Sequence, residues 1–199
     1  MNSADLKADL RLEARSLRRR THAEFGQSAA QDFIDHGLAA VSHVWNARPA
    51  VVAGYLAVGS ELDAGPLMAA LAGGGWSLAL PVVVGPETAL IFRRWQQGDA
   101  MGEGSFGIAQ PLDSAPQVRP DLVLAPLLAF DELGYRLGQG GGFYDRTLAN
   151  WRHHGPMVPV LGLAFAAQQV ASVPRDQFDQ RLSGMITESG WRNYGADPQ

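Results

Sequence analysis

The sequence predicts an α/β protein, a three-layer α/β/α sandwich around a mostly parallel, mixed sheet. The first reason is that apolar segments of strand length alternate along the chain with segments of helical periodicity. The second is that several strand segments are apolar throughout, which is typical of parallel strands covered by helices on both faces. The chain has 199 residues, 46% of them hydrophobic, with no internal repeat or long linker, so we expect residues 1–199 to form a single domain.

The first predicted element is a helix over residues 3–20, with Ser3 as its N-cap and leucines at helical spacing along one stripe. Positive residues occupy a neighbouring face at spacings of three and four: Lys7, Arg11, Arg15 and Arg18. This face could bind anions, and the alternative is a solvated helix surface. A second helix is predicted over residues 28–43, where apolar residues again recur with a helical period.

The remaining elements alternate between strands and helices. Apolar runs predict strands over residues 50–57, 76–84, 89–95, 121–128, 158–165 and 184–187. One helix is predicted over residues 63–72, and the glycines at 73–75 terminate it. Another is predicted from about residue 141 to residue 151. Residues 98–107 form a turn-rich connection, and residues 193–199 a loose polar tail. Ligands of such sheets bind beyond the carboxyl ends of the strands, where residues 55–61 and 130–146 would lie.

Composition excludes several classes of function. The net charge of −4 and the pI near 5.7 argue against a nucleic-acid partner. The absence of cysteine excludes disulfides, zinc–thiolate sites and thiol nucleophiles. The longest apolar run, residues 122–130, is too short to span a membrane, and the amino end lacks an apolar stretch of signal-peptide length. We therefore expect a cytoplasmic protein, a monomer or weak homo-oligomer, with small molecules as partners.

Residues 130–146 contain five glycines, two arginines and three carboxylates directly after a predicted strand. Glycine lets backbone N–H groups line an anion site without interference from Cβ atoms, arginines add positive charge, and a carboxylate can hold the magnesium that accompanies nucleotide phosphates. This glycine loop therefore predicts a phosphate site, and a flexible surface loop is the alternative. The chain has no G-x-x-x-x-G-K-[ST] motif, and the loop lacks the spacing G-x-G-x-x-G.

Residues 136–146 read R-L-G-Q-G-G-G-F-Y-D-R and resemble the R-L-G-x-G-x-G-[YF]-Y-D-R signature of the 5-formyltetrahydrofolate cyclo-ligase (5,10-methenyltetrahydrofolate synthetase) family. Four further stretches are similar to that family in the same order: residues 7–11, 55–61, 92–111 and 179–188. The resemblance implies an enzyme that uses ATP and Mg²⁺ to convert 5-formyltetrahydrofolate, with or without a polyglutamate tail, to 5,10-methenyltetrahydrofolate, ADP and phosphate. The γ-phosphoryl group would activate the formyl oxygen before N10 closes the ring, which requires positioning and charge neutralisation rather than a protein nucleophile.

The resemblance places the ATP contacts in two segments. They are Lys7, Ala8, Asp9, Leu10 and Arg11 at the amino end, and Arg136, Leu137, Gly138, Gln139, Gly140, Gly141, Gly142, Phe143 and Tyr144 in the glycine loop. Lys7 and Arg136 are the implied catalytic residues. Lys7 is the only lysine beside fifteen arginines, which indicates that a compact point charge is required there. A surface lysine without a partner is the alternative.

For the metal, the resemblance implies Asp145 as one Mg²⁺ ligand and Asp179 as the second, with Asp176 as the alternative because the alignment is open there. Two carboxylates suffice because Mg²⁺ keeps waters and phosphate oxygens as further ligands. Asp145 could instead interact with the dipole of its helix. The implied folate contacts are Leu56, Glu61, Phe106 and Tyr144, among which Glu61 would accept from the N–H edge of the pterin.

The residues also leave two other functions open. One is a sugar-phosphate isomerase, which would need a catalytic carboxylate or histidine in the pocket and no nucleotide. The other is a folate-binding relative without turnover, which the joint presence of Lys7, Arg136 and Asp145 argues against. The five histidines have no metal-ligand spacing, so we expect them to be incidental.

Overall fold

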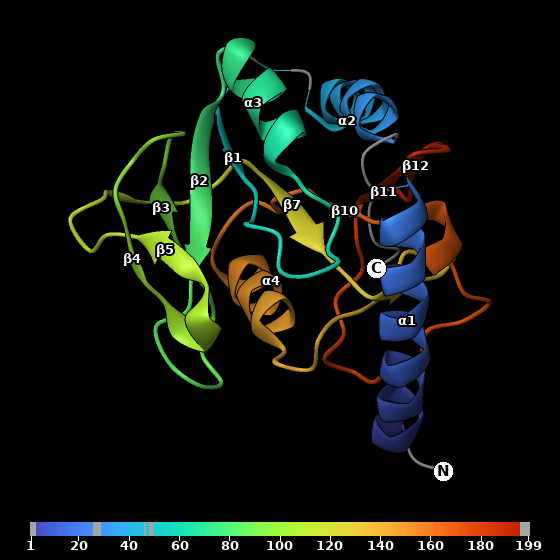
Figure 1. The fold of residues 1–199 in the computed structure, drawn as a ribbon. Helices are drawn as coiled ribbons and strands as arrows, with labels where there is room; N and C mark the ends of the chain where they lie inside the picture. The colour runs from blue at the N-terminus through green and yellow to red at the C-terminus, as the bar shows by residue number, and fades with distance from the viewer. Residues whose placement is uncertain (1–2, 26–28, 46, 48–49, 196–199) are drawn as a thin grey trace.

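The computed structural model describes residues 3–25, 29–45, 47 and 50–195. Its main sheet has eight strands in the order β12-β11-β10-β7-β1-β2-β3-β6 (Figure 1). Five neighbouring strands are parallel: β11 (Gly184–Thr187), β10 (Val160–Leu163), β7 (Leu122–Pro126), β1 (Val51–Ala53) and β2 (Ser77–Val82). Antiparallel strands complete the edges: β12 (Gly190–Asn193) at one, and β3 (Ile91–Arg94) and β6 (Gln117–Val118) at the other. The prediction of a mixed, mostly parallel sheet is confirmed.

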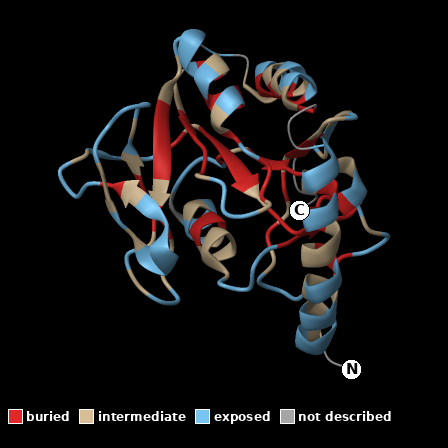
Figure 2. Ribbon diagram, in the orientation of Figure 1, coloured by how far each residue is buried: buried red, intermediate tan, exposed pale blue. Residues whose placement is uncertain are grey.

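Helices cover both faces of this sheet. They are α2 (Ala30–Val44) and α3 (Gly65–Gly73) on one face and α4 (Phe143–His154) on the other. Side chains of β7 alternate between the two faces: Leu122 and Leu124 belong to the same cluster as Leu67 of α3, whereas Val123 belongs to the cluster of Leu148 in α4. Figure 1 shows α2 and α3 above the strands and α4 below them, and Figure 2 shows the strands between as buried. The three-layer prediction is confirmed.

Helix α1 (Ser3–Phe25) lies outside the three layers. Its apolar contacts belong to a third cluster, in which Ala14 packs with Leu128 and Leu137 at the end of the sheet. The helix extends beyond its predicted end at residue 20. The predicted N-cap is wrong, because Ser3 is itself helical and its hydroxyl donates to the Arg175 carbonyl oxygen at 3.3 Å.

The glycine loop contains a short hairpin that the sequence did not indicate. Its strands are β8 (Ala129–Phe130) and β9 (Arg136–Leu137). The buried Asp131 fixes the turn, since its carboxylate accepts from the backbone N–H groups of Leu133, Tyr135 and Val173, each at 3.0 Å. One of the three carboxylates counted in this loop is therefore structural. Strands of two residues have no measurable period, so apolar patterning could not reveal them.

Further elements differ from the prediction. A second hairpin, of β4 (Met101–Glu103) and β5 (Ala109–Pro111), begins in the turn-rich segment, and strands β6 and β12 were not predicted. Helix α4 begins at Phe143 rather than near residue 141, because Gly142 has a φ of +65°, a left-handed conformation that glycine adopts readily. Residue 28, where the second helix was expected to begin, and residues 196–199 of the expected tail lie outside the described residues.

Candidate active site

Two loops meet at the carboxyl edge of the parallel strands, as the sequence predicted. The segment after β1 and the glycine loop line two adjoining cavities, of about 760 Å³ and about 590 Å³. We call the first the polar cavity and the second the ring cavity. Glu61, Gln139, Phe143 and Tyr144 line both cavities. The two spaces therefore share a wall, and two ligands could approach each other there.

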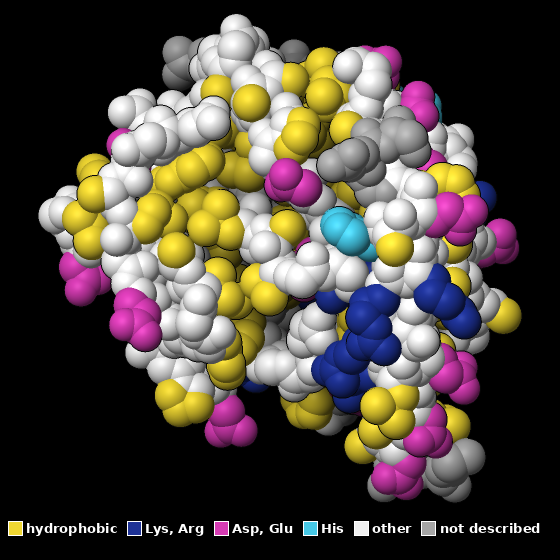
Figure 3. Space-filling view, viewed as in Figure 1, with side chains coloured by type: hydrophobic (Ala, Val, Ile, Leu, Met, Phe, Trp, Pro, Cys, Tyr) yellow, Lys and Arg dark blue, Asp and Glu magenta, His cyan; other side chains and the backbone are white. Residues whose placement is uncertain are grey.

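Positive side chains surround the polar cavity. Lys7 and Arg11 come from α1, Arg136 from β9 and Arg146 from α4. Figure 3 shows lysine and arginine side chains gathered over α1, beside a hollow where hydrophobic side chains are exposed. The loop from Gly138 to Gly142 forms another part of the lining and leads into the amino end of α4. A helix amino end and several cations form a surface that favours phosphate.

Arg136 is the most deeply buried cation of the polar cavity, with its side chain 4% exposed. Its Nη1 donates to the Gln180 carbonyl oxygen at 2.7 Å, and its Nη2 to Oδ1 of Asp145 at 2.8 Å. The backbone N–H of Gln180 donates to the same Oδ1 at 3.0 Å. Because two acceptors hold this buried guanidinium, its positive charge has a fixed position in the cavity.

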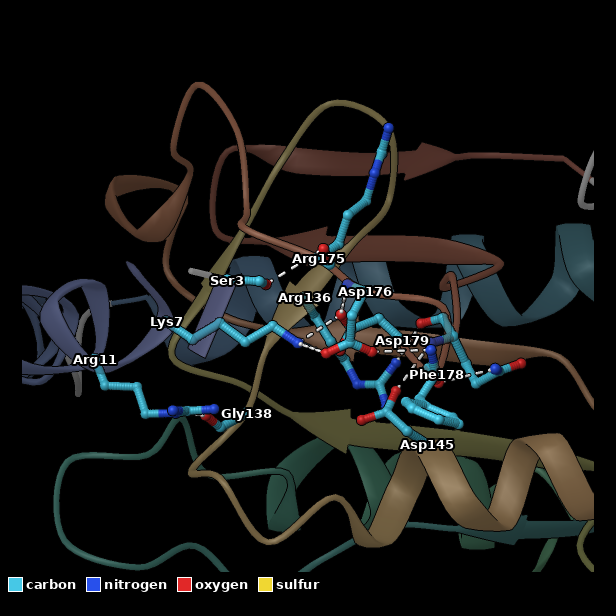
Figure 4. A network of polar contacts seen from close by, with 11 residues as sticks. Ser3, Lys7, Arg11, Arg136, Gly138, Asp145, Arg175, Asp176, Phe178 and Asp179 are labelled. Carbon is cyan, nitrogen blue, oxygen red and sulfur yellow. Dashed lines mark hydrogen bonds and ion pairs between the residues drawn. The ribbon is translucent and has the colours of Figure 1, made fainter. Parts of the chain in front are cut away.

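Lys7 is not an unpartnered surface lysine. Figure 4 shows its Nζ between two carboxylates, 2.6 Å from Oδ2 of Asp179 and 2.9 Å from Oδ2 of Asp176. Burial acts to lower the pKa of Lys7, but the hydrogen bonds to Asp179 and Asp176 outweigh it and raise this pKa above its ordinary value. The bond from Lys7, followed by that from the Phe178 N–H, lowers the pKa of Asp176. Lys7 and Asp176 therefore stay charged at neutral pH.

The carboxylates leave room for a cation that brings other ligands with it. Among the described residues no group bonds to Oδ2 of Asp145, whose side chain is 28% exposed. Oδ2 of Asp179 is already occupied by Lys7 and by the Asp176 N–H. The described residues contain no group of three or more His, Cys, Asp or Glu side chains that could hold a metal alone. This donor set fits Mg²⁺ only where phosphate and water complete its coordination.

Other cations of α1 bind the backbone of the glycine loop. Nε of Arg11 donates to the Gly138 carbonyl oxygen at 3.0 Å, and Nη2 of Arg15 donates to the Gln139 carbonyl oxygen at 3.4 Å. The neighbouring residues that the sequence grouped with Lys7 lie differently: Ala8 and Asp9 are exposed, and Leu10 packs against the third apolar cluster. The predicted ATP contacts of Ala8, Asp9 and Leu10 thus gain no support from side-chain placement.

The ring cavity has apolar and aromatic walls. Its lining includes Tyr55, Leu56, Phe106 and Tyr144, beside the carboxylate of Glu61. Burial raises the pKa of Tyr55 and of Tyr144, and the nearby charge of Glu61 contributes to both shifts. The two phenols are therefore neutral donors at any physiological pH. All four predicted folate contacts, Leu56, Glu61, Phe106 and Tyr144, lie in this one lining.

Phe106 lies at the turn of the β4–β5 hairpin in an unusual conformation. Its φ of 61° is left-handed, a region that residues with a Cβ rarely adopt, and its side chain is 77% exposed. The ring meets that of Phe143 edge-on, with centroids 6.1 Å apart. Phe106 lines the ring cavity, and strained backbone of this kind clusters at ligand sites.

The sequence did not assign three polar residues of the site to it. Arg18 is buried against Glu61, Arg146 lies over the Phe143 ring at 5.1 Å, and the backbone of Gln180 bonds to both Arg136 and Asp145. The sequence offered a signal for Arg18, which continues the spacing of Lys7, Arg11 and Arg15. It offered a weaker one for Arg146, the last residue of the signature, and none for Gln180.

Taken together, the fold and the site define an α/β protein in which a cavity lined by cations adjoins a cavity with apolar and aromatic walls. The comparisons identify the family. The model of the 5-formyltetrahydrofolate cyclo-ligase family matches residues 3–188. The chain is 35% identical to the 5-formyltetrahydrofolate cyclo-ligase of Escherichia coli K12 over 186 residues, which cover 90% of this chain and 97% of the relative. It is 34% identical to that of Haemophilus influenzae, over 90% of this chain and 96% of the relative.

Solved structures agree with this result. The NMR structure of Aquifex aeolicus 5,10-methenyltetrahydrofolate synthetase superposes with a TM-score of 0.77 at 27% identity, covering 98% of this chain and 95% of that one. The synthetase of Mycoplasma pneumoniae has the same fold, with a TM-score of 0.70 at 20% identity over 92% of this chain and 98% of that one. The chain belongs to the 5-formyltetrahydrofolate cyclo-ligase family and is an enzyme of the ligase class. No helix in the described part of the chain is long and apolar enough to cross a bilayer.

Proposed function

We propose that residues 1–199 act as one domain that converts 5-formyltetrahydrofolate to 5,10-methenyltetrahydrofolate, with ATP and Mg²⁺ as co-substrate and cofactor and with ADP and phosphate as the other products. The shared wall between the polar and ring cavities is the observation that carries this proposal. Transfer of a phosphoryl group from a nucleotide to a folate requires the two ligands to be in contact. They can meet at the shared wall, which Tyr144 lines. The names of the relatives support the same substrate.

In this proposal the polar cavity holds ATP. Arg136 and Lys7 neutralise the charge that spreads over the transferring phosphoryl group, and the loop from Gly138 to Gly142 binds the phosphates. Asp145 and Asp179 would hold Mg²⁺, with Asp176 as the alternative to Asp179. When bound, the metal would offset the negative charge of the phosphates. For Lys7 to reach a phosphate, its bonds to the two carboxylates must be exchanged, which frees Asp179 at the same time.

The ring cavity holds the folate. Leu56, Phe106 and Tyr144 would contact the flat pterin, and Glu61 would accept hydrogen bonds from its N–H edge. The formyl oxygen would then point across the shared wall, so that its phosphorylation and the attack of N10 take place between the cavities. A polyglutamate tail, the cytoplasmic location and the monomeric or weakly associated state stay predictions.

The isomerase alternative has one feature in its favour, since His153 lines the polar cavity. It does not account for the ring cavity or for the membership of the cyclo-ligase family. The reaction itself decides between the functions. The purified protein should form the methenyl product, followed by its absorbance, only when 5-formyltetrahydrofolate and MgATP are both present. Stabilisation against heating by each of these ligands without any product would favour a non-catalytic folate-binding protein, and stabilisation by glucosamine-6-phosphate alone would favour the isomerase.

The solitary lysine permits a chemical test of the nucleotide site. Acylating reagents attack the neutral amine, so a raised pKa leaves less reactive Lys7 at a given pH, and Lys7 should react more slowly than an unperturbed lysine. Asp176→Asn removes one source of the shift and should accelerate the reaction. MgATP should protect Lys7 while the amino-terminal amine, the internal standard, reacts as before. Mass spectrometry reports both rates, and equal labelling of Lys7 with and without MgATP would contradict a nucleotide contact.

A further inference from the structure

Arg18 of α1 forms a buried ion pair with Glu61. Its side chain is 7% exposed and that of Glu61 10%, and Nη1 lies 3.3 Å from Oε1. Nε of Arg18 donates to the hydroxyl of Ser60 at 3.2 Å, which fixes the plane of the guanidinium. The other carboxylate oxygen, Oε2, accepts from the backbone N–H of Val58 at 3.1 Å. Among the described residues, each oxygen of Glu61 thus has one donor.

This arrangement leaves a defined part of Glu61 available to a ligand. A carboxylate can accept about four hydrogen bonds, two at each oxygen. With one position on each oxygen taken by Arg18 and Val58, one position on each stays open, and Glu61 lines both cavities. Two open acceptor positions side by side match a pair of parallel N–H donors on the edge of a flat ring.

The charge balance also requires Arg18. A neutral ring supplies N–H donors but no positive charge, so a buried Glu61 that bound such a ring alone would remain an uncompensated anion, which is costly. Arg18 lines neither of the two cavities, within the described surface, and it approaches Glu61 from the α1 side. Its position allows it to neutralise the carboxylate without occupying space that a ligand needs.

We infer that Arg18 is a positioning residue of the folate site, which holds the Glu61 carboxylate in the orientation that binds the ring edge and compensates its charge. The inference rests on the proposed function, because it assumes that Glu61 contacts the folate. It also links the two halves of the site through one element, since Lys7 and Arg11 of the same helix line the polar cavity. A residue that only anchored α1 would therefore affect both substrates, whereas a residue that positions Glu61 affects one.

The test compares Arg18→Met with Arg19→Met. Arg19 is an exposed neighbour on the same helix, so the control removes the same charge without touching Glu61. Arg18→Met should raise the KM for 5-formyltetrahydrofolate by about ten- to a hundredfold, which is the loss of affinity expected when a charge-assisted hydrogen bond is removed. The KM for ATP should stay within about twofold of the wild-type value. Arg19→Met should leave both constants unchanged. Equal increases in both constants for Arg18→Met, or no increase in either, would overturn the inference in favour of an anchoring role.

A double-mutant cycle with Glu61→Gln provides the second readout. If Arg18 acts through Glu61, the KM for folate in the double variant Arg18→Met/Glu61→Gln should stay within about twofold of that in Glu61→Gln alone. The double variant should also melt at a higher temperature than Arg18→Met, because it no longer buries an unpaired carboxylate. Independent, multiplicative effects on KM would contradict the inference even if each variant bound folate poorly.

Arg18→Lys is a second variant for the case in which Arg18→Met does not fold. Should Arg18→Met fail to fold, Arg18→Lys keeps the charge but lacks the planar fork that reaches both Ser60 and Glu61, and the KM for folate should rise severalfold with that for ATP unchanged. The inference would then be overturned if Arg18→Lys left the KM for folate unchanged and if its effect multiplied independently with that of Glu61→Gln. Failure of the proposed function looks different, because the wild-type protein would then form no methenyl product at all.

Discussion

The variant Asp145→Asn is expected to lower turnover by about a hundredfold or more, and to leave the affinity for 5-formyltetrahydrofolate within about twofold. The asparagine can keep an acceptor oxygen for Arg136 and the Gln180 N–H, so the local structure should persist. It removes the negative charge and the oxygen that no described residue bonds. The substitution should therefore weaken only metal binding and the phosphoryl transfer that the metal assists.

Steady-state kinetics and calorimetric titration with each substrate measure this result. Asp113→Asn is a suitable control, because that carboxylate is 92% exposed and lies in the surface pair with Arg93. Unaltered turnover in Asp145→Asn would exclude Asp145 as a metal ligand and leave it as a partner of Arg136 in the first turn of α4. Loss of folate affinity instead of turnover would mean that the two cavities are assigned to the wrong substrates.

Arg136→Met is expected to have the largest effect, because this residue contributes to both catalysis and stability. Its removal eliminates a fixed positive charge in the polar cavity, and turnover should fall by about a thousandfold or more. It also leaves the Asp145 carboxylate and the Gln180 carbonyl oxygen without their shared donor. The free energy of unfolding should decrease by about 3 kcal/mol. This value is near the lower end of the range for breaking a buried ion pair, because the Asp145 side chain is 28% exposed.

Urea unfolding and single-turnover assays separate these two effects. The double variant Arg136→Met/Asp145→Asn removes the unpaired carboxylate, so it should recover part of the stability without recovering turnover. Arg136→Lys keeps the charge but cannot reach both acceptors at once, so its turnover should lie between those of wild type and Arg136→Met. Recovery of turnover together with stability in the double variant would show that Arg136 supports the fold alone.

The fold could be predicted because its signals are long and local. Fully apolar strands such as residues 122–126 and helices that end at glycine are visible in the sequence, and the carboxyl-edge rule correctly placed the loop after β1 beside the glycine loop. The hairpins could not be predicted in the same way. The β8–β9 turn depends on the carboxylate of Asp131, which binds three backbone N–H groups, one of them on Val173 far along the chain.

The sequence named candidate residues for the site but did not indicate the ion pairs that they form. Lys7 was predicted as a phosphate contact with an unpartnered lysine as the alternative, whereas the structure pairs it with Asp176 and Asp179. Arg18 was predicted on a face for anions, and its partner is Glu61, which follows the next helix and the first strand of the chain. Partners so distant depend on how α1 packs, and neither charge spacing nor helical period contains that information.

The position of α1 separates the requirements for folding from the requirements for activity. None of the described residues of α1 belongs to the two large apolar clusters on the faces of the eight-stranded sheet. A chain that started after residue 25 would therefore keep the side chains that cover both faces of the main sheet, although it would uncover Leu128 and Leu137, which pack with Ala14. It would lose Lys7, Arg11 and Arg18, and with them one wall of the polar cavity and the counter-ion of Glu61. Solubility of a shortened clone would thus give no information about its competence as an enzyme.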